Sequence, residues 1–207
     1  NTTGHSNVAV GANSGDAITT GDANVAVGYV ALGATTTGDF NTAVGRGAMA
    51  ANTTASNNTG LGYSALSSNT TGTYNVAVGR RALEANTTAQ ENVAVGYLVL
   101  DAATTADYNT AVGHNAAGAL TTGHSNTALG NDALLVATTG TYNTIIGCLA
   151  GDAITTASDN TFVGGKAGGA NTTGTMNTFM GVGSGDAITT SSYNVAIGGN
   201  ALGAATT

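Results

Sequence analysis

Few residues in this chain are of the types that perform catalysis or bind metal ions. Its 207 residues include 3 His, 1 Cys and 11 Asp or Glu. His5, His114, His124 and Cys148 are widely separated in the sequence, and none of them combines with acidic residues at the spacing of a metal site. We therefore predict that the protein is not an enzyme and has no metal or cofactor. A single Cys also excludes a disulfide framework.

Aromatic residues are the other chemically useful side chains, and they recur at a constant interval. There are two series, Tyr29, Tyr63 and Tyr97 in the first and Phe40, Tyr74, Tyr108 and Tyr142 in the second. Arg46 and Arg80 lie midway between members of the first series, where a cation can stack on two ring faces. We interpret both series as rings that pack at corners of the fold. The alternative is a ligand-contact edge for surface glycans, because exposed Tyr beside Asn and Thr suits a sugar.

Asn-Thr-Thr triplets provide candidate acceptors for N-linked glycosylation at Asn52, Asn69, Asn86 and Asn171, and a fifth triplet begins at Asn1; Asn57 begins the related Asn-Asn-Thr. The Asn of each Asn-Thr-Thr triplet lies at position 12 of a repeat described below, and the residue three positions earlier varies together with the residue at that position. Leu66 precedes the polar Asn69, whereas Gly15 precedes the large Ile18. The two positions are therefore expected to fill one interior volume, which would turn the Asn inward and prevent modification. Gly168 with Asn171 breaks this rule. We favour coincidence over glycosylation.

All of these residues belong to a repeat of 17 residues that covers the chain without insertion or deletion. Its first residue is Asn in twelve copies, at Asn7, Asn24, Asn41, Asn58, Asn75, Asn92, Asn109, Asn126, Asn143, Asn160, Asn177 and Asn194. Gly follows four residues later in every copy, and two Thr occupy repeat positions 13 and 14. This period predicts one uninterrupted repeat domain over residues 1–207. Because the chain opens and closes within a repeat, we expect a processed chain or a section of a longer array.

The composition of the repeat predicts strands rather than helices. Each copy contains an invariant Gly together with β-branched Thr and Val, which are unfavourable within helices, and the β-branched residues are favoured in strands. Seventeen residues suit one coil of a parallel β-solenoid (β-helix or β-roll), with three short strands and three corners. Stacked coils lie about 4.8 Å apart, so about 12 coils would form a rod about 58 Å long.

Alternation along a strand predicts which positions of the repeat face the core. Position 4, counted from the Asn, is always apolar, as in Val44, Val78 and Val112, and we expect it inside. Strand periodicity then turns position 2 inward and position 3 outward. By the same reasoning positions 9, 12 and 14 face inward, and positions 8 and 13 face outward. The Asn at position 1 should form an amide ladder, and the Gly at position 5 should have a positive φ.

Two surface features follow from this assignment. Position 3 is mostly Ala, but three consecutive copies carry Ile145, Phe162 and Phe179, which we predict to form an exposed self-association patch. Cations are confined to positions 6 and 7, and almost all acids to positions 10, 16 and 17. These charged corners either provide solubility or orient neighbouring rods.

Charge and hydropathy exclude two classes of partner. The chain has 4 Lys or Arg against 11 Asp or Glu and a net charge of −7, which argues against binding to nucleic acid. Its apolar runs are far too short to cross a membrane, and no charged and then apolar leader precedes the first repeat, so we expect no membrane insertion.

The repeat, seen nearly whole from Asn41 to Thr54, resembles repeats of phage tail-fibre-like proteins. It is more distantly similar to the head repeats of trimeric autotransporter adhesins. The second resemblance implies a trimer of left-handed parallel β-rolls, although the adhesin repeat is shorter. The positions shared with these families are structural, so no functional residues can be transferred.

We expect a non-enzymatic structural protein that forms the rod or subunit of an extracellular fibre or filament. Its partner would be itself, as a trimer or a filament built by end-to-end and lateral packing. The expected location is extracellular, at the cell surface or on a virion. An adhesin or a receptor-binding or glycan-binding fibre is the alternative. A minor alternative is an ice-binding solenoid, because outward Thr at position 13 would form an unbroken ladder.

Overall fold

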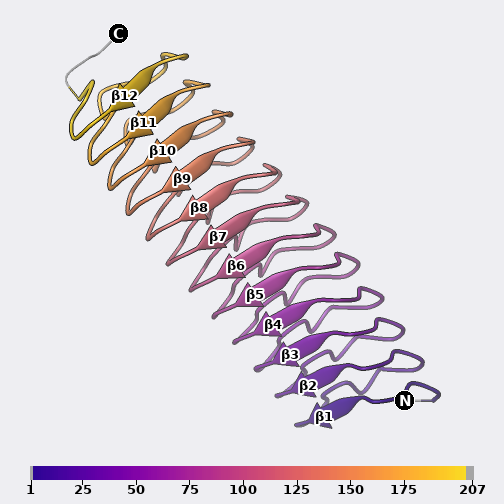
Figure 1. The fold of residues 1–207 in the computed structure, drawn as a ribbon. Helices are drawn as coiled ribbons and strands as arrows, with labels where there is room; N and C mark the ends of the chain where they lie inside the picture. The colour runs from indigo at the N-terminus through magenta and orange to yellow at the C-terminus, as the bar shows by residue number, and fades with distance from the viewer. Residues whose placement is uncertain (1, 204–207) are drawn as a thin grey trace.

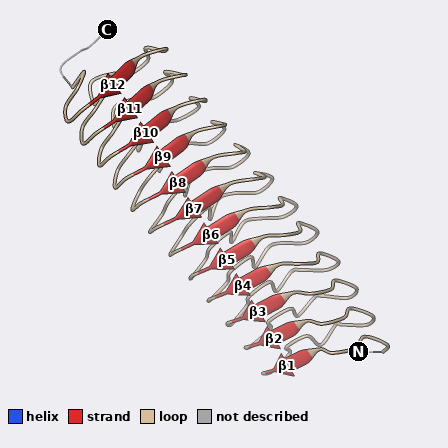
Figure 2. Cartoon of the chain, in the orientation of Figure 1, coloured by secondary structure: helices blue, strands red, loops and turns tan. Residues whose placement is uncertain are grey.

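The computed structural model describes residues 2–203, which form a straight stack of coils (Figure 1). Each coil contributes one three-residue strand, and parallel pairing of successive strands produces a single 12-stranded sheet (Figure 2). The strands are β1 (Val8–Val10), β2 (Val25–Val27), β3 (Thr42–Val44), β4 (Thr59–Leu61), β5 (Val76–Val78), β6 (Val93–Val95), β7 (Thr110–Val112), β8 (Thr127–Leu129), β9 (Thr144–Ile146), β10 (Thr161–Val163), β11 (Thr178–Met180) and β12 (Val195–Ile197). The described residues contain no helix. The predicted parallel β-solenoid with one 17-residue coil per repeat is confirmed.

Identical repeat positions of adjacent coils lie against one another throughout the stack. Val76 pairs with Val93, the residue one repeat later, and the rest of the two strands follows in the same register. Outside the sheet the coils are tied in the same way, since the Thr70 amide donates to the Thr87 carbonyl at 2.9 Å. Every side of the rod is therefore held by hydrogen bonds that run from coil to coil.

Only one side of each coil is a regular strand, whereas the sequence predicted three. Repeat positions 5, 7, 9 and 17 have positive φ, for example Gly79 at 130°, Arg81 at 59° and Leu83 at 51°. An extended strand cannot contain such residues, so they divide the other two sides into turns. The positive φ predicted for position 5 is confirmed. A Cβ on Gly79 would also overlap the Gly96 carbonyl, which explains why Gly is retained at this position.

The predicted orientation of the strand was wrong. Ala77 at position 3 is fully buried, whereas Val76 and Val78 on either side of it are partly exposed. Positions 2 and 4 therefore form the outer face of the sheet, and the small residues at positions 3 and 8 face the interior. The expectation failed because it assumed that the largest apolar side chains must be buried. The coil is narrow, so the small Ala side chains at positions 3 and 8 face the interior and leave room for one larger side chain. That side chain comes from position 9, as with Leu83.

The pairing of positions 9 and 12 is confirmed. Leu66 and Asn69 are both fully buried. Where position 9 is Gly15, a Cβ on it would lie 3.0 Å from Cδ1 of Ile18, so the Ile occupies the space that Leu fills elsewhere. The two positions share one volume, as close packing requires.

The exception at Gly168 is resolved by position 3, which also overturns the predicted self-association patch. Ile145, Phe162 and Phe179 are fully buried and cannot form a surface patch. A Cβ on Gly168 would overlap the Phe162 ring, and one on Gly185 would overlap the Phe179 ring. The rings therefore fill the interior volume that Leu occupies at position 9 of other coils.

Buried Asn side chains form two columns along the rod. In the first, at position 1, Oδ1 of Asn58 accepts from the backbone N of Asn75 at 2.9 Å and from its Nδ2 at 3.2 Å. Asn75 Nδ2 also donates to the Ala89 carbonyl at 2.8 Å. This pattern satisfies amides that have no access to water, and it confirms the predicted ladder.

The second column, at position 12, contains the Asn-Thr-Thr sites, of which Asn1 lies outside the described residues, and it is not a continuous ladder. Asn52, Asn69, Asn86 and Asn171 are all fully buried, so the prediction that they face inward is confirmed. Asn86 Nδ2 donates to Asn69 Oδ1 at 3.0 Å. The side-chain amide of Asn171 has no hydrogen-bond partner among the described residues. Its neighbours at position 12 of the adjacent coils are Ile154 and Ile188, which cannot continue an amide ladder.

Candidate functional surfaces

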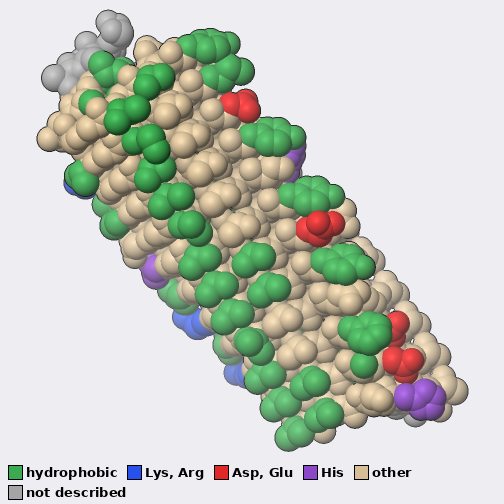
Figure 3. All heavy atoms as spheres, viewed as in Figure 1, with side chains coloured by type: hydrophobic (Ala, Val, Ile, Leu, Met, Phe, Trp, Pro, Cys, Tyr) green, Lys and Arg blue, Asp and Glu red, His purple; other side chains and the backbone are tan. Residues whose placement is uncertain are grey.

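The outer face of the sheet, formed by positions 2 and 4, combines apolar side chains at position 4 with Val or Thr at position 2. Its positions from β1 to β12 contain only Val, Thr, Leu, Ile and Met. Figure 3 shows the apolar members of this face as a stripe of hydrophobic side chains along the rod. Several remain well exposed, such as Val44 at 38%, Val112 at 37% and Met180 at 42%. We call this surface the sheet face.

A ladder of alternating Tyr and Arg runs along position 6, on the side where each strand ends. We call it the Tyr–Arg edge, and it comprises Tyr29, Arg46, Tyr63, Arg80, Tyr97 and His114. The Arg46 guanidinium lies 5.7 Å from the Tyr29 ring centroid and 5.8 Å from that of Tyr63. These are cation–π distances, and they confirm that the cations stack between the rings.

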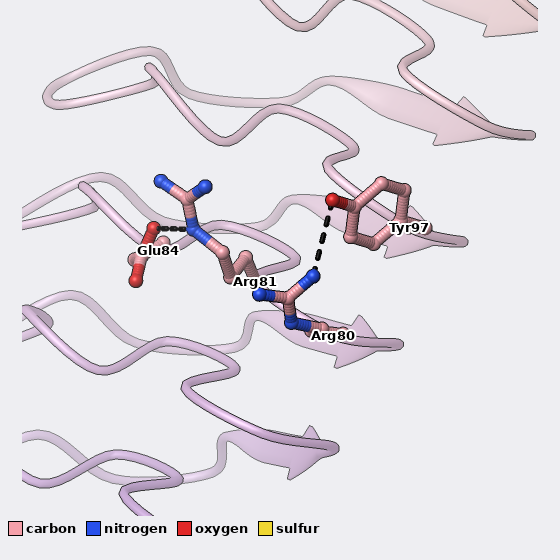
Figure 4. A network of polar contacts seen from close by, with 4 residues as sticks. All are labelled: Arg80, Arg81, Glu84 and Tyr97. Atoms are coloured by element: carbon pink, nitrogen blue, oxygen red, sulfur yellow. Dashed lines mark hydrogen bonds and ion pairs between the residues drawn. The ribbon is translucent and has the colours of Figure 1, made fainter.

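Arg80 repeats this arrangement, with its guanidinium 5.7 Å from the Tyr63 ring centroid and 5.4 Å from that of Tyr97. Its Nη1 also donates to the Tyr97 hydroxyl at 3.1 Å (Figure 4). The Tyr97 and His114 ring centroids lie 5.5 Å apart. Because Arg covers both faces of the Tyr63 ring, a sugar cannot stack there without displacing a cation.

The second aromatic series lies at position 17, separated from the following strand only by the Asn at position 1. Phe40, Tyr74, Tyr108 and Tyr142 are each at least half exposed. Their backbones have positive φ, between 57° and 60°. Gly or Asn would satisfy that conformation at lower cost, and the intervening coils place small or polar residues there. The fold does not require large rings at these positions, so they are candidates for a contact outside the chain.

A groove of about 290 Å³ lies between two of these rings. It is lined by Tyr108 and Tyr142 together with Asp107, His124 and Ser125. His124 meets Tyr142 edge to face, with ring centroids 5.2 Å apart. The groove thus combines aromatic side chains with carboxylate, imidazole and hydroxyl groups, which is the chemistry that recognises a sugar or another small polar ligand.

Acids at position 16 have a structural role as well as a charge. Asp39 Oδ1 accepts from the Asp22 backbone N at 2.7 Å, and Asp107 Oδ1 accepts from the Gln90 backbone N at 2.8 Å. These bonds satisfy backbone donors at the corner, and a Ser hydroxyl at Ser158 does the same for Thr141 at 3.0 Å.

Position 10 carries acids whose ionisation is disturbed. Burial raises the pKa of the Asp101 carboxyl above its ordinary value, while the Arg81 guanidinium opposes that rise. Arg81 itself pairs with Glu84, and the hydrogen bond between them raises the pKa of the guanidinium (Figure 4). Burial also raises the pKa of Asp152.

The two Thr ranks differ from the predicted arrangement. Thr70 at position 13 is partly buried, and its hydroxyl donates to the Thr87 carbonyl at 2.9 Å. Thr71 at position 14 is exposed, so the expectation that it faces inward was wrong. Turns at positions 5, 7 and 9 break the strict alternation from which that orientation was derived. From Thr19 to Thr172 each hydroxyl at position 13 donates to a backbone carbonyl of the next coil, whereas among residues 2–203 no hydroxyl at position 14 does so.

Residues 2–203 contain no group of three or more His, Cys, Asp or Glu that could hold a metal ion. Cys148 is exposed and lies at position 6. Among the described residues there is also no helix long and apolar enough to cross a membrane.

The chain matches no family model, and no curated protein or solved structure is significantly similar to it. The likeness of the repeat to tail-fibre-like proteins therefore stays a prediction. What the chain does has to be inferred from its own surfaces.

The sheet face was missed at the level of sequence, although one signal for it exists. Position 2 exchanges freely between Val and Thr, as in Val25 and Thr42. A buried position would not accept a hydroxyl without a partner, so this exchange is typical of a surface.

Proposed function

We propose that this chain is the shaft of an extracellular fibre or filament and has a purely structural role. One observation carries the proposal: the Asn at position 1, the Gly at position 5 and the Thr at position 13, which are common to all repeats, serve the stacking of coils, whereas the edges vary. Asn75 is bonded within a ladder of its own copies, and Gly79 lies where the next coil leaves no room for a Cβ. A protein selected for a single binding site would not need to preserve these features in every coil.

The hydrogen-bond pattern supports a load-bearing role. Backbone and side-chain bonds on every side of the coil run along the rod axis, and their strands repeat at about 4.8 Å as in other stacked-strand assemblies. A pull along the rod is therefore shared among many parallel bonds, which suits a shaft that holds two structures apart.

Immunogold labelling tests this role. Antibodies against the chain should decorate extended fibres on the producing cells or virions, and antibodies first absorbed with purified protein should not. Label confined to the cell interior, away from any fibre, would contradict a shaft.

A second function, glycan binding along the position 17 edge, is favoured by the groove between Tyr108 and Tyr142. On a glycan array, Tyr108→Ala and Tyr142→Ala should each abolish any binding that the unmodified chain shows. Tyr63→Ala is the matched control, because the faces of that ring are covered by Arg46 and Arg80. Equal loss in all three variants would argue against this groove.

A further inference from the structure

The sheet face is large enough to form a stable interface with a partner. Twelve strands spaced about 4.8 Å apart give it a length of about 58 Å, and the side chains of positions 2 and 4 cover a width of about 10 Å. Covering it would remove about 580 Å² from each of two surfaces, or about 1,150 Å² in total. Exposed apolar patches above a few hundred Å² mark interaction sites, and a stable interface needs about 1,000 Å².

Opposite charges border the two sides of this face. Beyond the strand ends, positions 6 and 7 carry all four cations, which are Arg46, Arg80, Arg81 and Lys166, with Asp132 as the single acid. Before the strand starts, positions 16 and 17 carry Asp22, Asp39, Glu91, Asp107 and Asp159 and no Lys or Arg. In Figure 3 the blue and red side chains accordingly lie on opposite sides of the hydrophobic stripe.

This asymmetry selects an orientation for a second copy laid face to face. If the two rods run antiparallel, the basic border of one meets the basic border of the other. If they run parallel, related by a two-fold axis along the rods, each basic border meets an acidic one. The parallel arrangement is therefore favoured, because it pairs opposite charges and separates like charges.

Charged residues also coincide in height along the rod. In a parallel pair, each strand lies at the same height as the equivalent strand of the partner. Residues that follow a strand in one rod therefore lie near the residues that precede the equivalent strand in the other rod. Arg46 follows β3 and Asp39 precedes it, while Lys166 follows β10 and Asp159 precedes it. Two opposite-charge contacts per copy thus fall at the same level without any sliding of the rods.

We propose that two copies of this chain pair in parallel through their sheet faces, with Arg46 and Lys166 of each rod directed at Asp39 and Asp159 of the other. The proposal rests on the shaft function and names its partner. A pair fits better than a ring of three, since two flat faces cover each other completely and three flat faces leave a gap at the centre.

Sedimentation equilibrium of the chain tests the pairing. We expect the mass of two chains for the unmodified protein and at least a tenfold weaker association for Val112→Asp. Val136→Asp is the matched control, because Val136 is 40% exposed and Val112 is 37% exposed, but Val136 lies at position 11, away from the sheet face. A monomer, a trimer, or equal effects of the two variants would overturn the pairing.

Orientation is tested by a spin label in the first coil, at Asn13→Cys in a Cys148→Ser background. Parallel rods bring the two labels to the same end, whereas antiparallel rods separate them by roughly 50 Å. The charge contacts are tested by Lys166→Asp, which should weaken association, and by adding Asp159→Lys, which should restore it, because both side chains are exposed. A long distance or a failed rescue would overturn the proposed geometry.

The outcomes also separate this inference from the shaft role. Fibres labelled by antibody but built from monomeric rods would overturn the pairing and leave the shaft role standing. A parallel pair that is not found in any fibre would overturn the shaft role and leave the pairing standing. A monomer that halts ice growth, with loss of that activity in Val112→Asp, would assign the sheet face to ice and overturn the pairing.

Discussion

The Phe162 and Phe179 rings stack inside the rod with their centroids 4.7 Å apart and an interplanar angle of 11°. They occupy the same position of adjacent coils, so their separation is close to that of the strands that carry them. Each ring lies over a Gly at position 9, which leaves the interior of these coils filled by aromatic side chains instead of Leu.

Gly168→Ala should therefore destabilise the rod strongly. The new Cβ would overlap the Phe162 ring, and overpacking of a core costs about 1 to 3 kcal/mol. Gly47→Ala separates this effect from backbone strain. Its φ of 69° is close to the 60° of Gly168, but a Cβ there would meet only Ser64 Oγ, at 3.6 Å. Urea unfolding should show about 1 kcal/mol lost for Gly47→Ala and clearly more for Gly168→Ala. Equal losses would exclude the ring overlap.

A double substitution should recover part of this loss. Phe162→Ala alone leaves a cavity and should cost about 3 to 5 kcal/mol, and Gly168→Leu alone should overpack the core. Together they recreate the Ala and Leu found in most coils, as in Ala77 and Leu83. A double-mutant cycle by urea unfolding should give a favourable coupling of at least about 1 kcal/mol. Additive losses would mean that the two residues do not share one volume.

The same pair of positions shows how far the sequence could be read. The period, the absence of helix and the pairing of positions 9 and 12 follow from residue types alone, because each copy must lie on an identical copy. The sequence also shows that position 3 is large in three of the four coils whose position 9 is Gly, as in Phe162 with Gly168 and Phe179 with Gly185; in the fourth, with Gly15, Ile18 at position 12 is the large residue. Two positions that vary together in this way share a volume, and recognising it would have turned position 3 inward.

Other features could not be predicted. Non-Gly residues with positive φ, such as Arg81 and Leu83, carry no mark in the sequence, since the backbone conformation is imposed by hydrogen bonds from neighbouring coils. Those residues broke the strand alternation from which the inward and outward assignments of positions 13 and 14 were derived. The groove between Tyr108 and Tyr142 arises from side chains two coils apart, so residue spacing suggested the rings but not the space between them.

Asn75→Ala should be among the most damaging single substitutions of a polar residue. It removes the acceptor of the Asn92 backbone amide, at 3.1 Å, and leaves that donor buried without a partner, which costs about 1 to 3 kcal/mol. Asn7→Ala makes the matched comparison, because Asn7 accepts from the Asn24 amide at 2.9 Å but is only partly buried. We expect the smaller change in thermal unfolding at Asn7, where water can replace the lost oxygen. The reverse order would argue against burial as the cause.

Stability should depend on the ionisation of Asp152. Burial raises the pKa of this carboxyl, and backbone hydrogen bonds oppose the rise only in part. A raised pKa means that the folded state binds the proton more tightly than the unfolded state does. Protonation of this carboxyl therefore stabilises the folded state, and the full stabilisation is present below the pKa of the unfolded chain, about 3.9. The stabilisation is lost as the pH rises through the higher pKa of the folded state.

Asp152→Asn should consequently unfold at a higher temperature than the unmodified chain near pH 7, since the amide carries no charge to bury. The difference should shrink as the pH is lowered toward about 3.5, where the native carboxyl is protonated as well. Asp159→Asn serves as the comparison, because its side chain is exposed and its charge stays hydrated. Melting temperatures of the three proteins, followed by circular dichroism across this pH range, decide the matter. A gain for Asp152→Asn that persists at low pH would trace the effect to packing and not to charge.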